Sequence, residues 1–147
     1  MNKKLFIIIG KSNSHKSSVI RCITGCPVSQ GNWKIKLSNN QIEDFYVAIT
    51  SPQERNNVGL APSDFISELK GKNEESILIA LQSTSTSNQP NGEVYLQAFI
   101  DNGFDIQKIA CFDSEAELLG LTNQLFNTQN IPSNETASLV RDMWEII

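Results

Sequence analysis

A glycine, a lysine and a serine stand at the spacing that a phosphate-binding loop requires. Gly10 ends a short apolar run, and Lys16 and Ser17 follow after five polar residues. Glycine permits a sharp exit from a strand because it tolerates backbone conformations that are closed to other residues. The N–H groups of such a loop surround a phosphate, the lysine supplies an ammonium, and the serine offers a hydroxyl to Mg²⁺. These residue types predict a site for a phosphate-bearing ligand.

The segments on either side of the loop have the patterns of elements that would position it. Lys4–Ile9 is a continuous apolar run apart from its first residue, typical of a strand that is buried on both faces. Residues 16–24 have the pattern of an amphipathic helix, which Gly25 ends as a C-cap. A helix that begins at Lys16 adds the positive end of its dipole to the loop. We expect the Lys16 side chain to face solvent there.

This strand–loop–helix segment resembles the Walker A motif of P-loop NTPases, with His15 in place of the last glycine. That position favours a left-handed backbone, which histidine tolerates better than most residues. The resemblance implies binding of a nucleoside triphosphate, with Lys16 on its β- and γ-phosphates and Ser17 on Mg²⁺ as the cofactor. The nucleotide-binding residues that it implies are Gly10, Lys11, Ser12, Asn13, Ser14, His15, Lys16, Ser17 and Ser18.

A second segment resembles part of the phosphate side of Ras-like small GTPases. Gln53, Glu54 and Arg55 match a Gln-Glu-Arg run that follows a metal-binding aspartate, although Thr50 stands at the place of that aspartate. The resemblance implies two catalytic residues, Gln53 to orient water and Glu54 to supply the missing carboxylate. It also implies that the strand before Thr50 lies beside the first strand, and that the last strand lies far from it. An ordinary polar turn is the alternative.

The base of the nucleotide is not specified by the sequence. The strand predicted over Ile106–Phe112 is not followed by the Asn-Lys-x-Asp that reads guanine in GTPases. Asp113 follows that strand. It could form a contact to the base, or it could be the residue before the cap of the next helix. ATP and GTP therefore stay open as ligands.

The rest of the chain alternates between strand and helix patterns. Further strands are predicted at 33–37, 42–50 and 76–82, and further helices at 62–70, 91–102, 114–126 and 135–147. The strands at 33–37 and 42–50 flank a short Asn turn and form an antiparallel hairpin. The alternation predicts an α/β, three-layer, P-loop NTPase-like fold with a mostly parallel sheet, one antiparallel edge hairpin and helices on both faces. Residues 1–147 form this single domain, and its element order resembles a Ras-like domain without the final strand.

Composition limits the partners and the compartment. The chain has 147 residues, of which 39% are hydrophobic, and its net charge of −4 disfavours general nucleic-acid binding. The apolar run Leu5–Ile9 is far shorter than the roughly 20 residues of a membrane span, so we expect no membrane partner and a cytoplasmic protein. Three cysteines, Cys22, Cys26 and Cys111, are expected as free thiols.

Three functions fit these patterns. The first is a nucleoside triphosphate-binding protein that hydrolyses its ligand slowly or only with a protein partner, as a switch or an assembly factor. The alternative is a degenerate P-loop module that binds a protein without catalysis, which His15 and Thr50 favour. A P-loop kinase would need a lid with clustered arginines, whereas Arg21, Arg55 and Arg141 are far apart in the sequence.

Overall fold

The computed structural model describes residues 2–12, 14–24, 30–112, 124–125 and 132–146. Strands and helices alternate along most of this part of the chain. The elements are β1 (Lys4–Gly10), α1 (Lys16–Thr24), β2 (Gln30–Lys36), β3 (Ile42–Ala48), the short 3₁₀ helix η1 (Pro52–Asn57), α2 (Pro62–Lys70), β4 (Ser76–Gln82), α3 (Gly92–Asp101), β5 (Asp105–Cys111), β6 (Gln124–Leu125) and α4 (Ser133–Trp144). The α/β class predicted from the sequence is confirmed.

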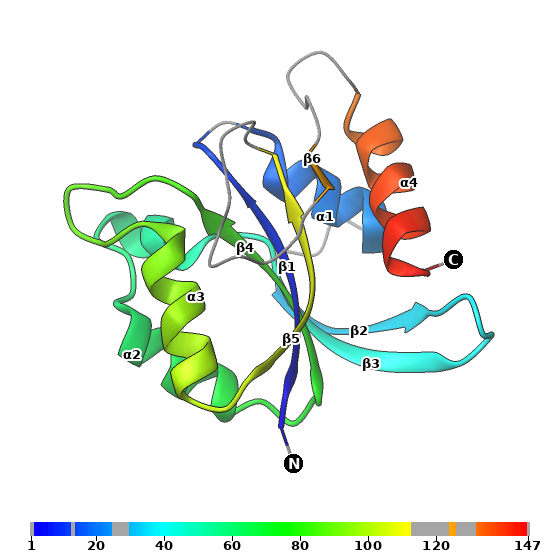
Figure 1. Ribbon diagram of the computed structural model, residues 1–147, viewed down its shortest axis with the longest axis horizontal. Coiled ribbons are helices and arrows are strands. Elements are labelled where there is room, and N and C mark those ends of the chain that lie inside the picture. The colour runs from blue at the N-terminus through cyan, green and yellow to red at the C-terminus, as the bar shows by residue number, and fades with distance from the viewer. Residues whose placement is uncertain (1, 13, 25–29, 113–123, 126–131, 147) are drawn as a thin grey trace.

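The strands form one sheet in the order β2-β3-β4-β1-β5-β6 (Figure 1). β2 runs antiparallel to β3 at one edge, and the other neighbouring pairs are parallel. The prediction of a mostly parallel sheet with an antiparallel edge hairpin is therefore confirmed. In a parallel set the carboxyl ends of the strands lie at the same edge of the sheet, so β1, β3, β4 and β5 all end on one side.

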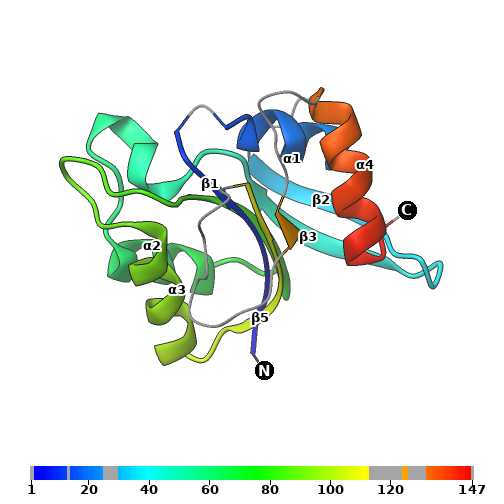
Figure 2. The same ribbon diagram turned by 45° about the horizontal axis from the view of Figure 1, so that its top comes forward.

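Helices cover both faces of the sheet. α2 and α3 pack on one face, where they share a core with Leu5, Ile7 and Ile9 of β1. α1 and α4 pack on the other face, together with Phe6 and Ile8. Figure 2 shows these two pairs of helices on opposite sides of the strands. Alternate residues of β1 thus point into two separate cores, as its continuous apolar run predicts.

The neighbours of β1 differ from those expected. β4 lies between β1 and β3, so the expectation that β3 pairs with β1 is wrong. β5 pairs directly with β1, so the expectation of a distant last strand is also wrong. Burial gives the reason: all seven residues of β4 are buried, as a central position requires, whereas the first three residues of β3 are not.

Two segments have a local structure that the sequence patterns did not predict. Gln124–Leu125, predicted as the end of a helix, forms β6 and pairs with Ala110 and Cys111 of β5. This pairing satisfies backbone groups at the sheet edge that a helix would leave open, and it supplies a short final strand. Residues 114–123 and 126 of that predicted helix lie outside the described residues. The polar stretch at 52–57, which lies between the predicted strand at 42–50 and the predicted helix at 62–70, forms η1 with proline at its first position, where the fixed φ of proline suits a helix.

Candidate functional site

The loop of residues 11–15 joins the carboxyl end of β1 to the N-terminus of α1, and it folds closely over Gly10. A Cβ atom on Gly10 would lie 2.6 Å from Ser14 Oγ and 3.0 Å from Phe112 Cβ. Ser14 is buried, and its hydroxyl donates to the Lys11 carbonyl oxygen at 2.7 Å. A side chain at position 10 would therefore force Ser14 of the loop or Phe112 to shift. Asn13 lies outside the described residues.

His15 adopts the left-handed backbone that its place in the loop predicts. Its φ is +67°, and its carbonyl oxygen accepts from the Val19 N–H at 3.0 Å, a bond of the first turn of α1. A left-handed conformation costs a residue with a Cβ atom about 1–2 kcal/mol. The side chain of His15 is exposed, so it does not supply that energy through a buried contact.

Lys16 is buried, which contradicts the expectation that it faces solvent. Its side chain has 6% exposure, and its Nζ donates to the Lys11 carbonyl oxygen at 2.7 Å. The ammonium also lies 3.5 Å from Ser14 Oγ. A buried ammonium needs oxygen acceptors in place of water, and the folded loop supplies them. The position of Lys16 as the first residue of α1, under the loop, thus explains its burial.

A pocket of about 280 Å³ opens beside the N-terminus of α1. It is lined by Ser14, His15, Lys16, Ser17, Ser18, Ile49, Thr50, Ser51 and Glu54. The start of α1 and the segment after β3 therefore meet here, as predicted, even though β4 separates β1 from β3. Most of the lining side chains carry a hydroxyl, an ammonium, an imidazole or a carboxylate.

The topology of the sheet marks the same end of the molecule. β1 and β4 are neighbours, and Gly10 is opposite Gln82 at their carboxyl ends. The chain leaves β1 toward α1 on one face and leaves β4 toward α3 on the other. In open α/β sheets, ligands bind in the crevice outside the carboxyl ends of two such strands.

Comparison of the chain with protein-family models, curated proteins and solved structures gave no match.

Gln53 is close to the pocket in sequence but does not line it. Its side chain is buried, with Nε2 donating to the Gln82 carbonyl oxygen at 2.8 Å and Oε1 accepting from the Gln82 N–H at 3.2 Å. These bonds attach the segment after β3 to the carboxyl end of β4. The predicted role of Gln53 in orienting water stays a prediction, whereas its structural role is clear from these contacts.

Of the other predicted groups near the phosphate side, Glu54 lines the pocket and has an exposed side chain, whereas Arg55 is not among the lining residues. Arg55 pairs with Glu68 at 2.6 Å, and its guanidinium lies 5.4 Å from the centre of the Phe65 ring. These contacts hold Arg55 against α2. Asp113, the residue considered for a base contact, lies outside the described residues.

Sequence reasoning missed Ser51, which directly follows the predicted strand. It lines the pocket, is 1% exposed, and its hydroxyl has no hydrogen-bond partner among the described residues. A serine after a buried strand is a weak signal by itself. Ser51 stands out only when the burial of its side chain and the missing hydrogen-bond partner of its hydroxyl are both known.

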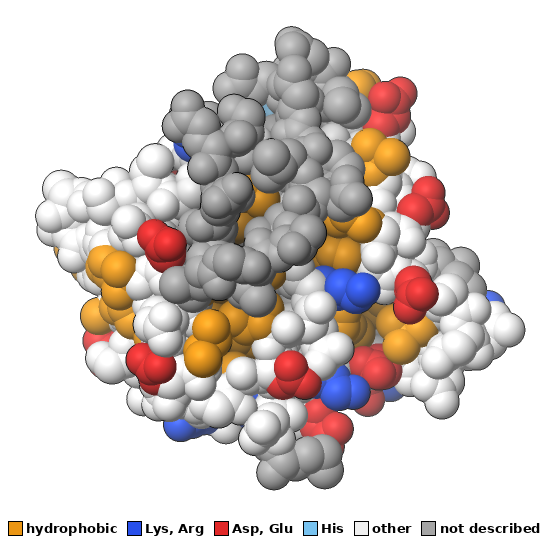
Figure 3. All heavy atoms as spheres, viewed as in Figure 1, with side chains coloured by type: hydrophobic (Ala, Val, Ile, Leu, Met, Phe, Trp, Pro, Cys, Tyr) orange, Lys and Arg blue, Asp and Glu red, His pale blue; other side chains and the backbone are white. Residues whose placement is uncertain are grey.

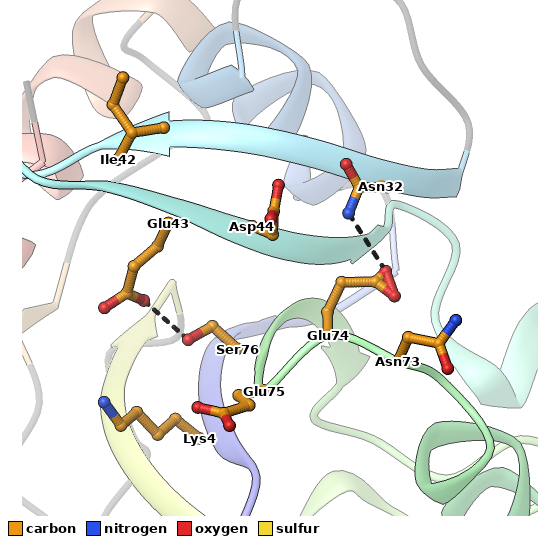
Figure 4. A pocket seen from close by; sticks show the side chains of 9 residues that line it. All are labelled: Lys4, Asn32, Ile42, Glu43, Asp44, Asn73, Glu74, Glu75 and Ser76. Carbon is orange, nitrogen blue, oxygen red and sulfur yellow. Dashed lines mark hydrogen bonds between the residues drawn. The ribbon is translucent and has the colours of Figure 1, made fainter.

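A second, larger pocket of about 540 Å³ lies at the opposite, amino end of the strands (Figure 4). Four of its lining residues are acidic, namely Glu43, Asp44, Glu74 and Glu75. Glu43 points toward Ser76 and accepts its hydroxyl at 2.8 Å. Four carboxylates against the single Lys4 in this lining make the pocket unfavourable for a phosphate chain.

The described surface shows no concentrated basic face on the side drawn in Figure 3, where lysines and arginines lie apart among carboxylates. Within the described ranges, no helix has the length and apolar character needed to cross a membrane, and no group of three His, Cys, Asp or Glu residues could hold a metal ion. Cys22 carries a free thiol, Cys111 is buried at the end of β5, and Cys26 lies outside the described residues.

Proposed function

We propose that this chain binds a nucleoside triphosphate with Mg²⁺ through residues 10–18, as a P-loop-like protein, and hydrolyses it slowly or only with a protein partner. The observation that carries the proposal is the 280 Å³ pocket at the N-terminus of α1, where Lys16, Ser17 and Glu54 share one lining. The left-handed His15 supports it, since the loop keeps the backbone shape that a glycine would give.

The electrostatics of the pocket favour a bound anion. The first turn of α1 contains no acidic residue, so the positive end of the helix dipole is not neutralised from within that turn. Lys16 adds an ammonium at the same place. Backbone N–H groups at a helix N-terminus hydrogen-bond phosphate oxygens directly.

The side-chain oxygen atoms around the pocket are of the kind that a magnesium ion binds. Ser17 offers a hydroxyl at the start of α1, and Thr50 and Glu54 offer a hydroxyl and a carboxylate from the segment after β3. Mg²⁺ prefers oxygen ligands and is usually bound by one or two carboxylates together with substrate phosphates. With ligand bound, the metal would neutralise charge on the phosphates.

We expect slow turnover because the two side chains closest in sequence to Glu54 are engaged in other contacts. Phosphoryl transfer depends on a positioned water and on charge neutralisation. Gln53 is held by two hydrogen bonds to Gln82, and Arg55 is paired with Glu68. Glu54 is thus the described side chain best placed to assist a water. An arginine from a partner would raise the rate by about 10³ to 10⁵.

Phosphate release from Mg²⁺-ATP and Mg²⁺-GTP, measured together with binding by calorimetry, tests this function. We expect binding of at least one nucleotide and turnover far below 1 s⁻¹ without a partner. Turnover near 1 s⁻¹ would contradict the proposed partner dependence, and Glu54→Gln would then test for a catalytic carboxylate. Absence of binding to either nucleotide would refute the proposed function.

The alternative function is a protein-binding module that has lost its ligand. The bond from the Lys16 ammonium to the Lys11 carbonyl favours it, because the loop then satisfies its own lysine. The same calorimetry separates the two functions, since a module without a ligand site binds neither nucleotide nor free polyphosphate.

A further inference from the structure

Ser51 is a buried polar residue in the lining of the pocket beside α1. The side chain is 1% exposed, and its Oγ has no hydrogen-bond partner among the described residues. A buried polar group without a partner is destabilising, so such groups are rare in folded proteins. A buried hydroxyl without a partner in the lining of a pocket therefore needs an explanation.

The position of Ser51 supplies that explanation. Ser51 lines the same pocket as Lys16 and Ser17, but it comes from the segment after β3 rather than from α1. Ser51 thus belongs to the wall of the pocket that the segment after β3 forms. The start of α1 forms the other wall and supplies the Lys16 ammonium and the positive end of the helix dipole. We expect a ligand in this pocket to lie between the two walls, with oxygen atoms close to Ser51.

We propose that Ser51 is a binding residue of this pocket, whose O–H donates to a phosphate oxygen of the bound polyphosphate. This inference rests on the proposed function and adds an anchor that the resemblance to P-loop proteins did not supply. Phosphate oxygens are strong acceptors, and hydrogen bonds to charged groups are about twice as strong as neutral ones. The group that costs stability without ligand therefore becomes satisfied when ligand binds.

The size of the pocket indicates which part of the ligand Ser51 contacts. Its volume of about 280 Å³ is just below the roughly 300–1,000 Å³ typical of sites for drug-sized ligands. The lining is mostly polar: Ile49 is its one apolar side chain, and the imidazole of His15 is its one ring. The pocket thus suits the phosphate chain, and tripolyphosphate, which has no base or sugar, is the probe for Ser51.

Thr136 provides a matched control. It lies in α4, is fully buried, and its Oγ1 also has no partner among the described residues, but it does not line this pocket. Thr136→Val removes that hydroxyl at nearly constant shape, as Ser51→Ala removes the other. Removing an unpartnered buried hydroxyl removes the free-energy cost of burying it, so both variants should have a higher Tm than the wild type in the absence of ligand. The expected rise is about 2–4 °C for each kcal/mol of that cost.

The experiment is calorimetric titration of wild type and both variants with tripolyphosphate and ATP, in Mg²⁺ and in EDTA. We expect Ser51→Ala to weaken tripolyphosphate binding by about 10- to 100-fold in both buffers and Thr136→Val to leave it unchanged. Equal affinity of Ser51→Ala and wild type would overturn the role of Ser51 while leaving the proposed function intact. A loss confined to Mg²⁺ would overturn the contact to phosphate, since it places Ser51 at the metal.

Two further outcomes are decided by the same titrations. If wild type binds neither probe, the proposed function fails, and the role of Ser51 fails with it. If Ser51→Ala does not fold, Ser51→Cys replaces it, because a thiol has the same shape as the hydroxyl and is somewhat larger, but is a weak donor. Tripolyphosphate binding by Ser51→Cys as tight as that by wild type would then overturn the role of Ser51.

Discussion

The ammonium of Lys16 donates a hydrogen bond to the carbonyl oxygen of Lys11, so the first residue of α1 closes the loop that leads into it. The bond spans five residues and lies beneath a loop that also contains the Ser14 hydroxyl. Under the proposed function, a phosphate chain in the pocket would draw the ammonium toward itself and weaken this bond. The proposal therefore ties both loop stability and ligand affinity to the side chain of Lys16.

Lys16→Ala is expected to abolish nucleotide binding and also to lower stability. The variant removes the ammonium beside the phosphates and deprives the Lys11 carbonyl of a charged donor, a loss of about 1–3 kcal/mol. Calorimetry and urea unfolding measure the two effects. Lys36→Ala, which removes an exposed lysine of β2, is the control for net charge. Unchanged nucleotide affinity in Lys16→Ala would refute the account of this loop.

Ser17→Ala is expected to weaken nucleotide binding mainly when Mg²⁺ is present. The Ser17 hydroxyl lines the pocket at the start of α1, and its proposed contact is the metal rather than a phosphate. Titration with ATP in Mg²⁺ and again in EDTA separates the contacts. Equal losses in the two buffers would show that Ser17 acts only as a residue of the helix N-terminus.

Gln53→Ala is expected to destabilise the fold by about 2–4 kcal/mol, because it leaves the Gln82 N–H and carbonyl without their partners. Glu54→Ala, which removes an exposed neighbour, should change stability by at most about 0.5 kcal/mol. Urea unfolding of both variants checks the difference. Similar stability of the two would contradict the structural role assigned to Gln53.

His15→Gly is expected to be more stable than His15→Ala by about 1 kcal/mol, since the φ of +67° suits glycine and strains alanine. Ser67, exposed within α2, provides the reverse case. There alanine should be more stable than glycine by about 0.5–1 kcal/mol. Urea midpoints of the four variants measure both orders. An advantage of alanine at both positions would exclude left-handed strain at His15.

Tyr95→Phe is expected to remove part of the loss of stability above pH 10. Tyr95 is buried on α3, its hydroxyl donates to the Leu60 carbonyl oxygen, and burial raises the pKa of Tyr95 from 10.0 to about 12. Between these two pH values the unfolded chain has lost this proton and the folded chain has kept it, so stability falls as pH rises. Unfolding at pH 9 and pH 11 measures the slope, which should be smaller in the variant. Identical slopes would contradict the raised pKa.

Much of the fold was predictable because strong local patterns specify it. The continuous apolar runs of β1 and β4 and the periodicity of α1 and α2 predicted elements close to those observed. The order of the strands was not predictable in the same way. Whether β3 or β4 lies beside β1 depends on which strand best tolerates burial on both faces, a comparison across the whole sheet.

The candidate site was predictable in part for a similar reason. The spacing of Gly10, Lys16 and Ser17 is local, and so is the need for a left-handed residue at position 15. The burial of Lys16, the bonds from Gln53 to Gln82 and the orphan hydroxyl of Ser51 depend on contacts between distant segments. Such contacts have no local signal in the sequence.

The most direct test of the central claim is a ¹⁵N NMR titration of the wild-type protein with Mg²⁺-ATP, which reports the amide of each residue separately. If the phosphates bind at the N-terminus of α1, the largest shifts fall on residues 10–18, with a smaller group at 49–54. Shifts centred on residues 73–76, at the acidic pocket, or no shifts at millimolar nucleotide would contradict the claim.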